Sequence, residues 1–144
     1  KIVRAWDIEK DKNKVLSIFQ KENTSLSDER YWEILRTVWI LCGSVDNVNL
    51  FRHYFASKRP QKHYFSTPEE AKRLREMPDE FKVYRATNAA TLTEDSGISW
   101  TLSYEYAVWY RDAYHKKFLQ ERLIDKPQVF ALIERNKEEE IIIL

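Results

Sequence analysis

The sequence has very few of the residues that interrupt regular structure, with 2 glycines and 4 prolines among 144 residues. This scarcity excludes long flexible linkers, collagen-like repeats and low-complexity segments. No apolar run approaches the roughly 20 residues that a membrane-spanning helix needs, so we expect no membrane association. Residues 1–14 mix both charges with apolar residues, which is not the pattern of a signal peptide.

Cysteine is also scarce, and neither sign of charge is in excess. The single cysteine, Cys42, cannot form an internal disulfide, and its spacing from His53, His63 and His115 is not typical of zinc ligands. We therefore predict no metal site and expect a cytoplasmic protein. Lysine and arginine total 24 against 23 acidic residues, with the two signs interleaved, so no basic stripe indicates nucleic acid.

Aromatic residues are abundant, with 5 Trp, 8 Tyr and 7 Phe, and apolar residues make up 43% of the chain. A chain of this length buries roughly two thirds of its extended surface, which is enough for a core without disulfides. We predict a single domain over residues 1–144 that packs around aromatic side chains. Trp6, Trp32 and Trp39 are expected in its core.

The N-terminal part, residues 1–79, shows helical patterns. Apolar residues recur at intervals of three and four over Tyr31–Cys42, and more weakly over Val48–Ser57. The sequence Thr67-Pro68-Glu69-Glu70 is a capping box with proline at the first helical position, and it predicts a short helix ending near Met77. This part of the chain is expected to form a helical platform.

From Glu80 onwards, in residues 80–144, strand patterns appear. Phe81–Ala86 alternates between apolar and polar residues and is rich in strand formers. The remaining patterns predict an extended segment over Gly97–Thr101, a helix over Tyr104–Leu123, a strand over Val129–Ile133, a charged turn over Arg135–Glu139 and a buried strand over Ile141–Leu144. The expected fold class is α+β, with the helical N-terminal half packed on a small β-sheet half.

Taken one at a time, the polar residues of this second half have ordinary structural explanations. An arginine such as Arg85 after two strand residues is usually a surface charge. Ser99 and Thr101 on either side of Trp100 are what any strand with one buried face would show. Glu138–Glu140 would form a solvated turn that also keeps the following isoleucines from aggregating.

In combination, these residues resemble the arginine-serine-glutamate class of mono-ADP-ribosyltransferases, in particular the small ADP-ribosyltransferase-like proteins of bacteria and phages. The matching segments, within residues 83–144, are Tyr84-Arg85 for the family's arginine, Ser99-Trp100-Thr101 for its Ser-x-Thr strand, Ala107–Tyr110 for its alanine-plus-aromatic helix and Glu138-Glu139-Glu140 for its Glu-x-Glu turn. The resemblance implies a β-sheet of that family's type and NAD as the substrate.

The resemblance also implies a role for each residue. Glu140 would stabilise the cation-like ribose that forms when nicotinamide leaves, and Glu138 would bind or deprotonate the acceptor, an unidentified protein or nucleic acid. Cofactor-binding residues would be Arg85 on the phosphates or ribose, Ser99 orienting the glutamate, and Thr101 supporting the strand or ribose. Aromatic candidates for stacking on the nicotinamide or adenine ring, unless they are core residues, are Tyr84, Trp100, Tyr104 and Tyr110.

Several alternatives stay open at this point. Ala86 stands where the family commonly has glycine, which favours a second hypothesis: a non-catalytic phage or bacterial binding protein on a degenerate transferase scaffold. Because a one-residue slip exchanges the two faces of a strand, Glu139 is also a candidate for the catalytic glutamate. The basic and aromatic residues between Arg52 and Tyr64 form a surface with no assigned use.

Overall fold

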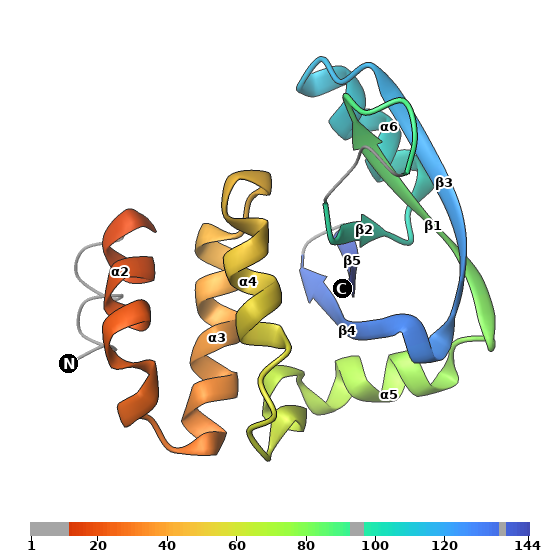
Figure 1. The fold of residues 1–144 in the computed structure, drawn as a ribbon. Coiled ribbons are helices and arrows are strands. Elements are labelled where there is room, and N and C mark those ends of the chain that lie inside the picture. Colours follow the sequence, from red (N-terminus) through yellow and green to blue (C-terminus); the bar gives the residue numbers. More distant parts are fainter. Residues whose placement is uncertain (1–11, 93–96, 136–137) are drawn as a thin grey trace. The chain divides into compact units, whose positions relative to one another are not determined.

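The computed structural model describes residues 12–92, 97–135 and 138–144 (Figure 1). Among these residues it has five α-helices, mostly towards the N-terminus, and one five-stranded antiparallel sheet. The predicted α+β class is therefore confirmed. None of the helices in the described part of the chain has both the length and the apolar character needed to cross a membrane.

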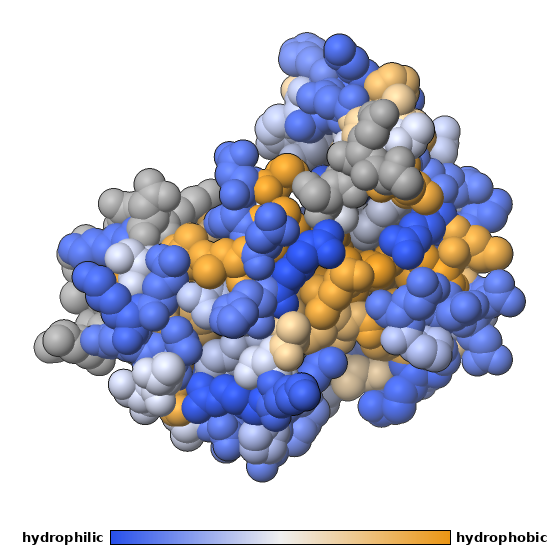
Figure 2. All heavy atoms as spheres, in the orientation of Figure 1, coloured by the Kyte–Doolittle hydropathy of each residue, from blue (hydrophilic) through white to orange (hydrophobic). Residues whose placement is uncertain are grey.

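Contacts divide the chain into two compact units, unit 1 over Lys1–Ser66 and unit 2 over Thr67–Leu144. The helix over residues 68–76, which the sequence grouped with the helical part, belongs to the unit that contains the sheet. The prediction of one domain for the whole chain stays a prediction. Figure 2 shows that the face drawn there carries many hydrophilic residues, with hydrophobic residues exposed among them.

The described residues of unit 1 form three α-helices joined by short turns. The helices are α2 (Lys12–Glu22), α3 (Asp28–Cys42) and α4 (Val48–Phe55), and 3₁₀ turns cover Asn23–Ser25, Val45–Asn47 and Lys62–Phe65. At the start of α3 the Ser27 side chain accepts a hydrogen bond from the Arg30 amide, and Gly43 caps its end. Helices α3 and α4 confirm the two periodic segments of the sequence.

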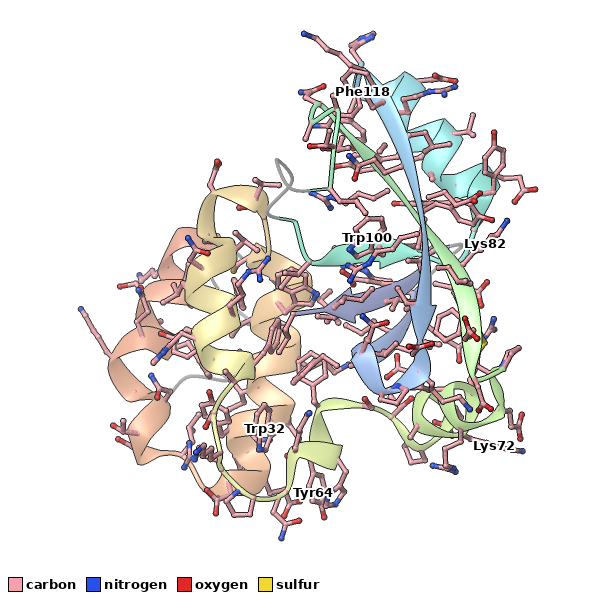
Figure 3. The ribbon with its side chains drawn as sticks, turned by 45° about the vertical axis from the view of Figure 1, so that its right-hand side comes forward. Trp32, Tyr64, Lys72, Lys82, Trp100 and Phe118 are labelled. Atoms are coloured by element: carbon pink, nitrogen blue, oxygen red, sulfur yellow. The ribbon has the colours of Figure 1, made fainter. Side chains whose placement is uncertain are left out.

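Aromatic rings fill the interior of unit 1. Phe19 meets Tyr54 edge to face with ring centroids 5.0 Å apart, and Trp39 meets Phe51 in the same way at 5.0 Å. Trp32 and Trp39 are buried, as predicted, and Figure 3 shows Trp32 among the helices. The prediction for Trp6 lies outside the described residues.

Within the basic and aromatic segment between Arg52 and Tyr64, Arg59 has a structural role. Its guanidinium donates to Asp28 Oδ1 over 2.9 Å and to the carbonyl oxygen of Asn23 over 3.0 Å, and it lies 4.5 Å from the centre of the Tyr31 ring. Planar donors of this kind hold several partners at once. This arginine is therefore a structural clamp on the chain between α2 and α3.

Unit 2 contains the sheet, in which the strands lie in the order β3-β1-β2-β5-β4 and every pairing is antiparallel. The strands are β1 (Glu80–Thr87), β2 (Ser99–Thr101), β3 (Phe118–Asp125), β4 (Val129–Arg135) and β5 (Glu138–Ile143). Its helices are α5 (Pro68–Glu76) and α6 (Tyr104–Ala113), with a 3₁₀ turn at Lys126–Gln128.

Helix α5 begins with the predicted capping box. The Glu70 amide donates to Thr67 Oγ1 over 3.1 Å, and the Thr67 amide donates back to Glu70 Oε1 over 2.8 Å. Glu70 Oε2 also accepts the amide of Glu134 over 2.8 Å, which ties the helix to β4. The buried Glu70 carboxylate thus has hydrogen-bonding partners from two elements.

Two sequence expectations about unit 2 are wrong. The helix predicted over Tyr104–Leu123 ends at Ala113, and residues Phe118–Asp125 form β3 instead. His115 has a left-handed backbone with φ of 54°, which ends the helical path, and all eight β3 residues pair with β1. The charged turn predicted over Arg135–Glu139 is shorter than expected, because Arg135 belongs to β4 and β5 begins at Glu138.

One face of the sheet packs against α5. The buried cluster on this face is Phe81, Val83, Trp100, Ile124, Leu132, Ile141 and Ile143, with Leu74 and Met77 from α5 against it. Because side chains alternate along a strand, Ser99, Thr101, Glu140 and Ile142 lie on the opposite face. This opposite face carries the residues that the family resemblance singled out on β2 and β5.

Candidate functional site

The sheet forks between β1 and β2. In the described residues these strands pair only at Tyr84 and Thr101, whereas β1 continues along β3 for eight residues and β2 continues along β5 (Figure 1). Thr101 in turn lies opposite Glu140. Tyr84, Thr101 and Glu140 therefore form one row across three strands, and they share a face of the sheet.

Glu140 is buried in this row, with 1% of its surface exposed. The Ser99 hydroxyl donates to Glu140 Oε2 over 2.5 Å, and Arg135 Nη2 donates to Glu140 Oε1 over 3.1 Å. A buried carboxylate is costly unless it has such partners. Each carboxylate oxygen of Glu140 thus has a protein donor in this structure.

Arg85 reaches across the fork from β1 to β2. Its Nη1 donates to the carbonyl oxygen of Ser99 over 2.9 Å, and its guanidinium lies against the α-carbon of Gly97, where a β-carbon would clash with it. Ser99 therefore contacts Arg85 through its carbonyl and Glu140 through its hydroxyl. Ser99 is thus in contact with both the arginine and the glutamate that the sequence singled out.

Glu138 lies two residues before Glu140 on the same face of β5. Its Oε2 is 3.4 Å from Arg135 Nε and accepts a hydrogen bond from the Tyr106 hydroxyl over 3.5 Å. Burial, followed by the negative charge of Glu138, raises the pKa of the Tyr106 hydroxyl to about 12. Arg135 consequently lies between the two carboxylates of Glu138 and Glu140.

Glu139 lies on the opposite face, the one covered by α5. It forms an ion pair with Arg73, whose Nη1 is also 3.8 Å from Glu134 Oε2. The sequence left open which of the three glutamates faces Ser99, and the strand pairing now shows this. Glu138 and Glu140 face the side of Ser99 and Thr101, and Glu139 does not.

The aromatic candidates separate into two groups. Tyr84 meets Tyr104 of α6 edge to face at 5.4 Å, and Tyr104 is half exposed. The Tyr110 ring packs against that of Tyr114, the residue after α6, with centroids 4.5 Å apart. The tyrosine rings of this group are exposed or partly exposed, whereas the Trp100 ring is almost fully buried.

The assignment of Trp100 to the cofactor-binding set needs correction. Trp100 belongs to the core cluster on the α5 face, with the Arg122 guanidinium 5.7 Å from its ring centre, and Figure 3 shows it within the sheet. It lies opposite Ile141, which also faces that core. Trp100 is therefore a core residue rather than a ring beside Glu140.

Two residues of this site, Arg135 and Tyr106, were not found from the sequence. The sequence predicts a turn that starts at Arg135, although the spacing of Arg135 from Glu138 also fits a β-hairpin in which the two residues face each other. Tyr106 had no signal beyond its place in an aromatic helix. Among the described residues, no three His, Cys, Asp or Glu side chains are close enough together to hold a metal ion.

Comparisons of the chain with protein-family models, with curated proteins and with solved structures found no match. The resemblance to mono-ADP-ribosyltransferases therefore depends on the motif residues and on the geometry that joins them.

Proposed function

We propose that unit 2 is an NAD-dependent mono-ADP-ribosyltransferase domain in which Glu140 is the catalytic carboxylate. The observation that carries this proposal is the linkage of Arg85, Ser99 and Glu140, from three different strands, through the carbonyl and the hydroxyl of Ser99. These three residues come from neighbouring strands of the sheet, and their contacts meet at one serine.

In the proposed reaction, the bond between the nicotinamide nitrogen and the ribose C1 atom breaks, and nicotinamide leaves with the electron pair. The acceptor then supplies an electron pair for the new bond to C1 and loses a proton. Glu140 would stabilise the positive charge that develops on the ribose, since a preorganised carboxylate in a buried site acts strongly on a nearby cation. The Ser99 hydroxyl would keep Glu140 oriented for this task.

The remaining site residues have roles that follow from their chemistry. Arg85 would hold a phosphate or the adjoining ribose, because a planar guanidinium suits oxyanions. Tyr84 and the half-exposed Tyr104 would contact the nicotinamide or adenine ring. Glu138 would accept the acceptor's proton, and Thr101 would support the row that carries Glu140.

The acceptor in this proposal is a protein or a nucleic acid in the same cytoplasm. A direct test is to incubate the purified chain with NAD and measure nicotinamide release and transfer of labelled ADP-ribose to each class of acceptor. Arg85→Lys keeps the charge but loses the planar donors, so it should raise the KM for NAD. Arg122→Lys, which changes an arginine on β3 beside Trp100, is the matched control and should leave KM unchanged.

A second function has one observation in its favour. Both oxygens of Glu140 are held by Ser99 and Arg135, as in a carboxylate that serves only structure. Under this alternative the scaffold is a non-catalytic binding protein, and Ala86 in place of glycine fits it too. The absence of nicotinamide release, together with an unchanged melting temperature in the presence of NAD, would select this alternative and contradict the transferase proposal.

A further inference from the structure

Arg135 lies at the end of β4, opposite Glu138 across the β4–β5 pairing. Its guanidinium contacts both carboxylates of the candidate site, with Nη2 3.1 Å from Glu140 Oε1 and Nε 3.4 Å from Glu138 Oε2. The Arg135 side chain is 32% exposed, whereas that of Glu140 is 1% exposed. The ion pair thus joins a buried carboxylate to a cation that reaches solvent.

This contact conflicts with the chemistry proposed for Glu140. A sugar hydroxyl that donates to Glu140 needs an oxygen of the carboxylate to be accessible, and Oε1 is the one held by Arg135. A guanidinium at this place also repels a sugar that becomes positively charged, since like charges a few ångströms apart disfavour one another strongly in a buried site. The arrangement with Arg135 on Glu140 is therefore not one that reacts.

Ser99 and Arg135 both donate to Glu140, and of these two side chains that of Arg135 is the one able to leave. Ser99 has a short side chain and lies on β2, which is paired with β5, so its hydroxyl stays beside Glu140. Arg135 has a long stem and a second partner in Glu138, which keeps a carboxylate next to the guanidinium after it leaves Glu140. When Arg135 leaves Glu140, Arg135 and Glu138 therefore remain paired with each other.

We propose that Arg135 is a self-inhibitory clamp on Glu140, and that the reacting state is one in which the ribose hydroxyl has replaced Arg135 at Oε1. This inference rests on the transferase function proposed above. If the released state is a minor one of about 10% or less, the clamp weakens the apparent affinity for NAD about tenfold or more. The clamp lowers affinity without removing any group that the reaction uses.

The test compares NAD turnover by the wild-type chain with that of Arg135→Gln, Arg135→Lys and Arg73→Gln. Arg73 forms the equivalent arginine–glutamate pair with Glu139 on the other face of β5, so it is the matched control. Arg135→Gln should lower the KM for NAD about tenfold with kcat kept or raised. Arg135→Lys should show a smaller decrease, and Arg73→Gln should leave both constants at the wild-type values.

Each outcome bears on a defined part of the proposal. A wild-type chain that turns over NAD together with a folded Arg135→Gln variant of unchanged or higher KM would overturn the clamp and leave the transferase function standing. If Arg135→Gln does not give a cooperative melting transition, Arg135→Lys decides by the direction of its change in KM. No turnover in any variant would contradict the transferase function and the clamp with it.

Discussion

The Ser99 hydroxyl on β2 donates to the buried Glu140 carboxylate on β5 over 2.5 Å, although the two residues are far apart in the sequence. The antiparallel pairing of these strands places Ser99 opposite Ile142 and Thr101 opposite Glu140, so the serine is a diagonal neighbour of the glutamate. This hydrogen bond joins the two motifs on which the proposed function depends.

Replacing Ser99 with alanine should lower both stability and activity. The change removes one donor from a buried carboxylate, so the free energy of unfolding should fall by about 1.5–3 kcal/mol, the usual worth of a hydrogen bond to a charged group. Nicotinamide release should fall as well, because Glu140 loses its orientation. Ser99→Thr keeps the hydroxyl on a strand-compatible side chain and is the control for urea denaturation and for activity. Equal stability of the alanine and wild-type chains would contradict the assigned hydrogen bond.

Gly97→Ala should separate activity from stability. The added β-carbon would meet the Arg85 guanidinium, which is the flexible end of a side chain and is able to move aside. Alanine also lowers the conformational entropy of the unfolded chain, which stabilises the fold by about 0.4–1 kcal/mol. The free energy of unfolding should therefore stay close to that of the wild type. The KM for NAD should rise, since Arg85 no longer lies on Ser99.

Gly43→Ala is the contrasting variant for this experiment. Its β-carbon would come within 2.7 Å of the Trp39 carbonyl oxygen, and Trp39 is a buried residue of unit 1. The expected result is a loss of about 1–3 kcal/mol through overpacking, with the KM for NAD unchanged in the folded fraction. A Gly97→Ala chain that binds NAD as the wild type does would show that the position of Arg85 is not required.

The raised pKa of the Tyr106 hydroxyl predicts a loss of stability at alkaline pH. Its pKa is raised to about 12 in the folded state by burial and by Glu138, whereas an unfolded tyrosine titrates near pH 10. Between these values the folded state retains a proton that the unfolded state loses, so stability falls as the pH rises from 10 to 12. Below pH 10 both states are protonated, and this contribution is fully present.

The measurement for Tyr106 is the urea midpoint of the wild type and of Tyr106→Phe at several pH values between 8 and 12. The phenylalanine variant cannot ionise at this position, so its midpoint should fall less steeply above pH 10. Parallel curves for the two chains would mean that the pKa of Tyr106 is not raised in the folded state.

Much of the local structure was accessible from the sequence because the signals were short-range. The Thr67–Glu70 capping box, the periodic apolar residues of α3 and the alternating residues of β1 all predict the elements that the structure contains. The segment after α6 was misjudged because Phe118 and Leu119 continue the helical spacing of the residues before them. Only the pairing with β1, which is a long-range contact, makes this segment a strand.

The candidate site was only partly accessible for a similar reason. Ile141–Ile143 is apolar at every position and buried on both faces of the sheet, so the sequence carries no alternation from which to choose among the three preceding glutamates. The pairing of Trp100 with Ile141 fixes that choice. Arg135 was missed because its importance comes from the hairpin register that places it beside Glu138 and Glu140.

The most direct test of the proposed function is nicotinamide release from NAD by Glu140→Gln, Glu139→Gln and the wild-type chain, each shown to be folded. Glutamine keeps the shape of glutamate but not its charge. Loss of an electrostatic group at the transition state should lower the Glu140→Gln rate by about 10² or more. Glu139→Gln, which alters the opposite face of β5, should release nicotinamide at the wild-type rate. A Glu140→Gln chain as fast as the wild type, or a Glu139→Gln chain that is equally impaired, would contradict the assignment of Glu140 as the catalytic residue.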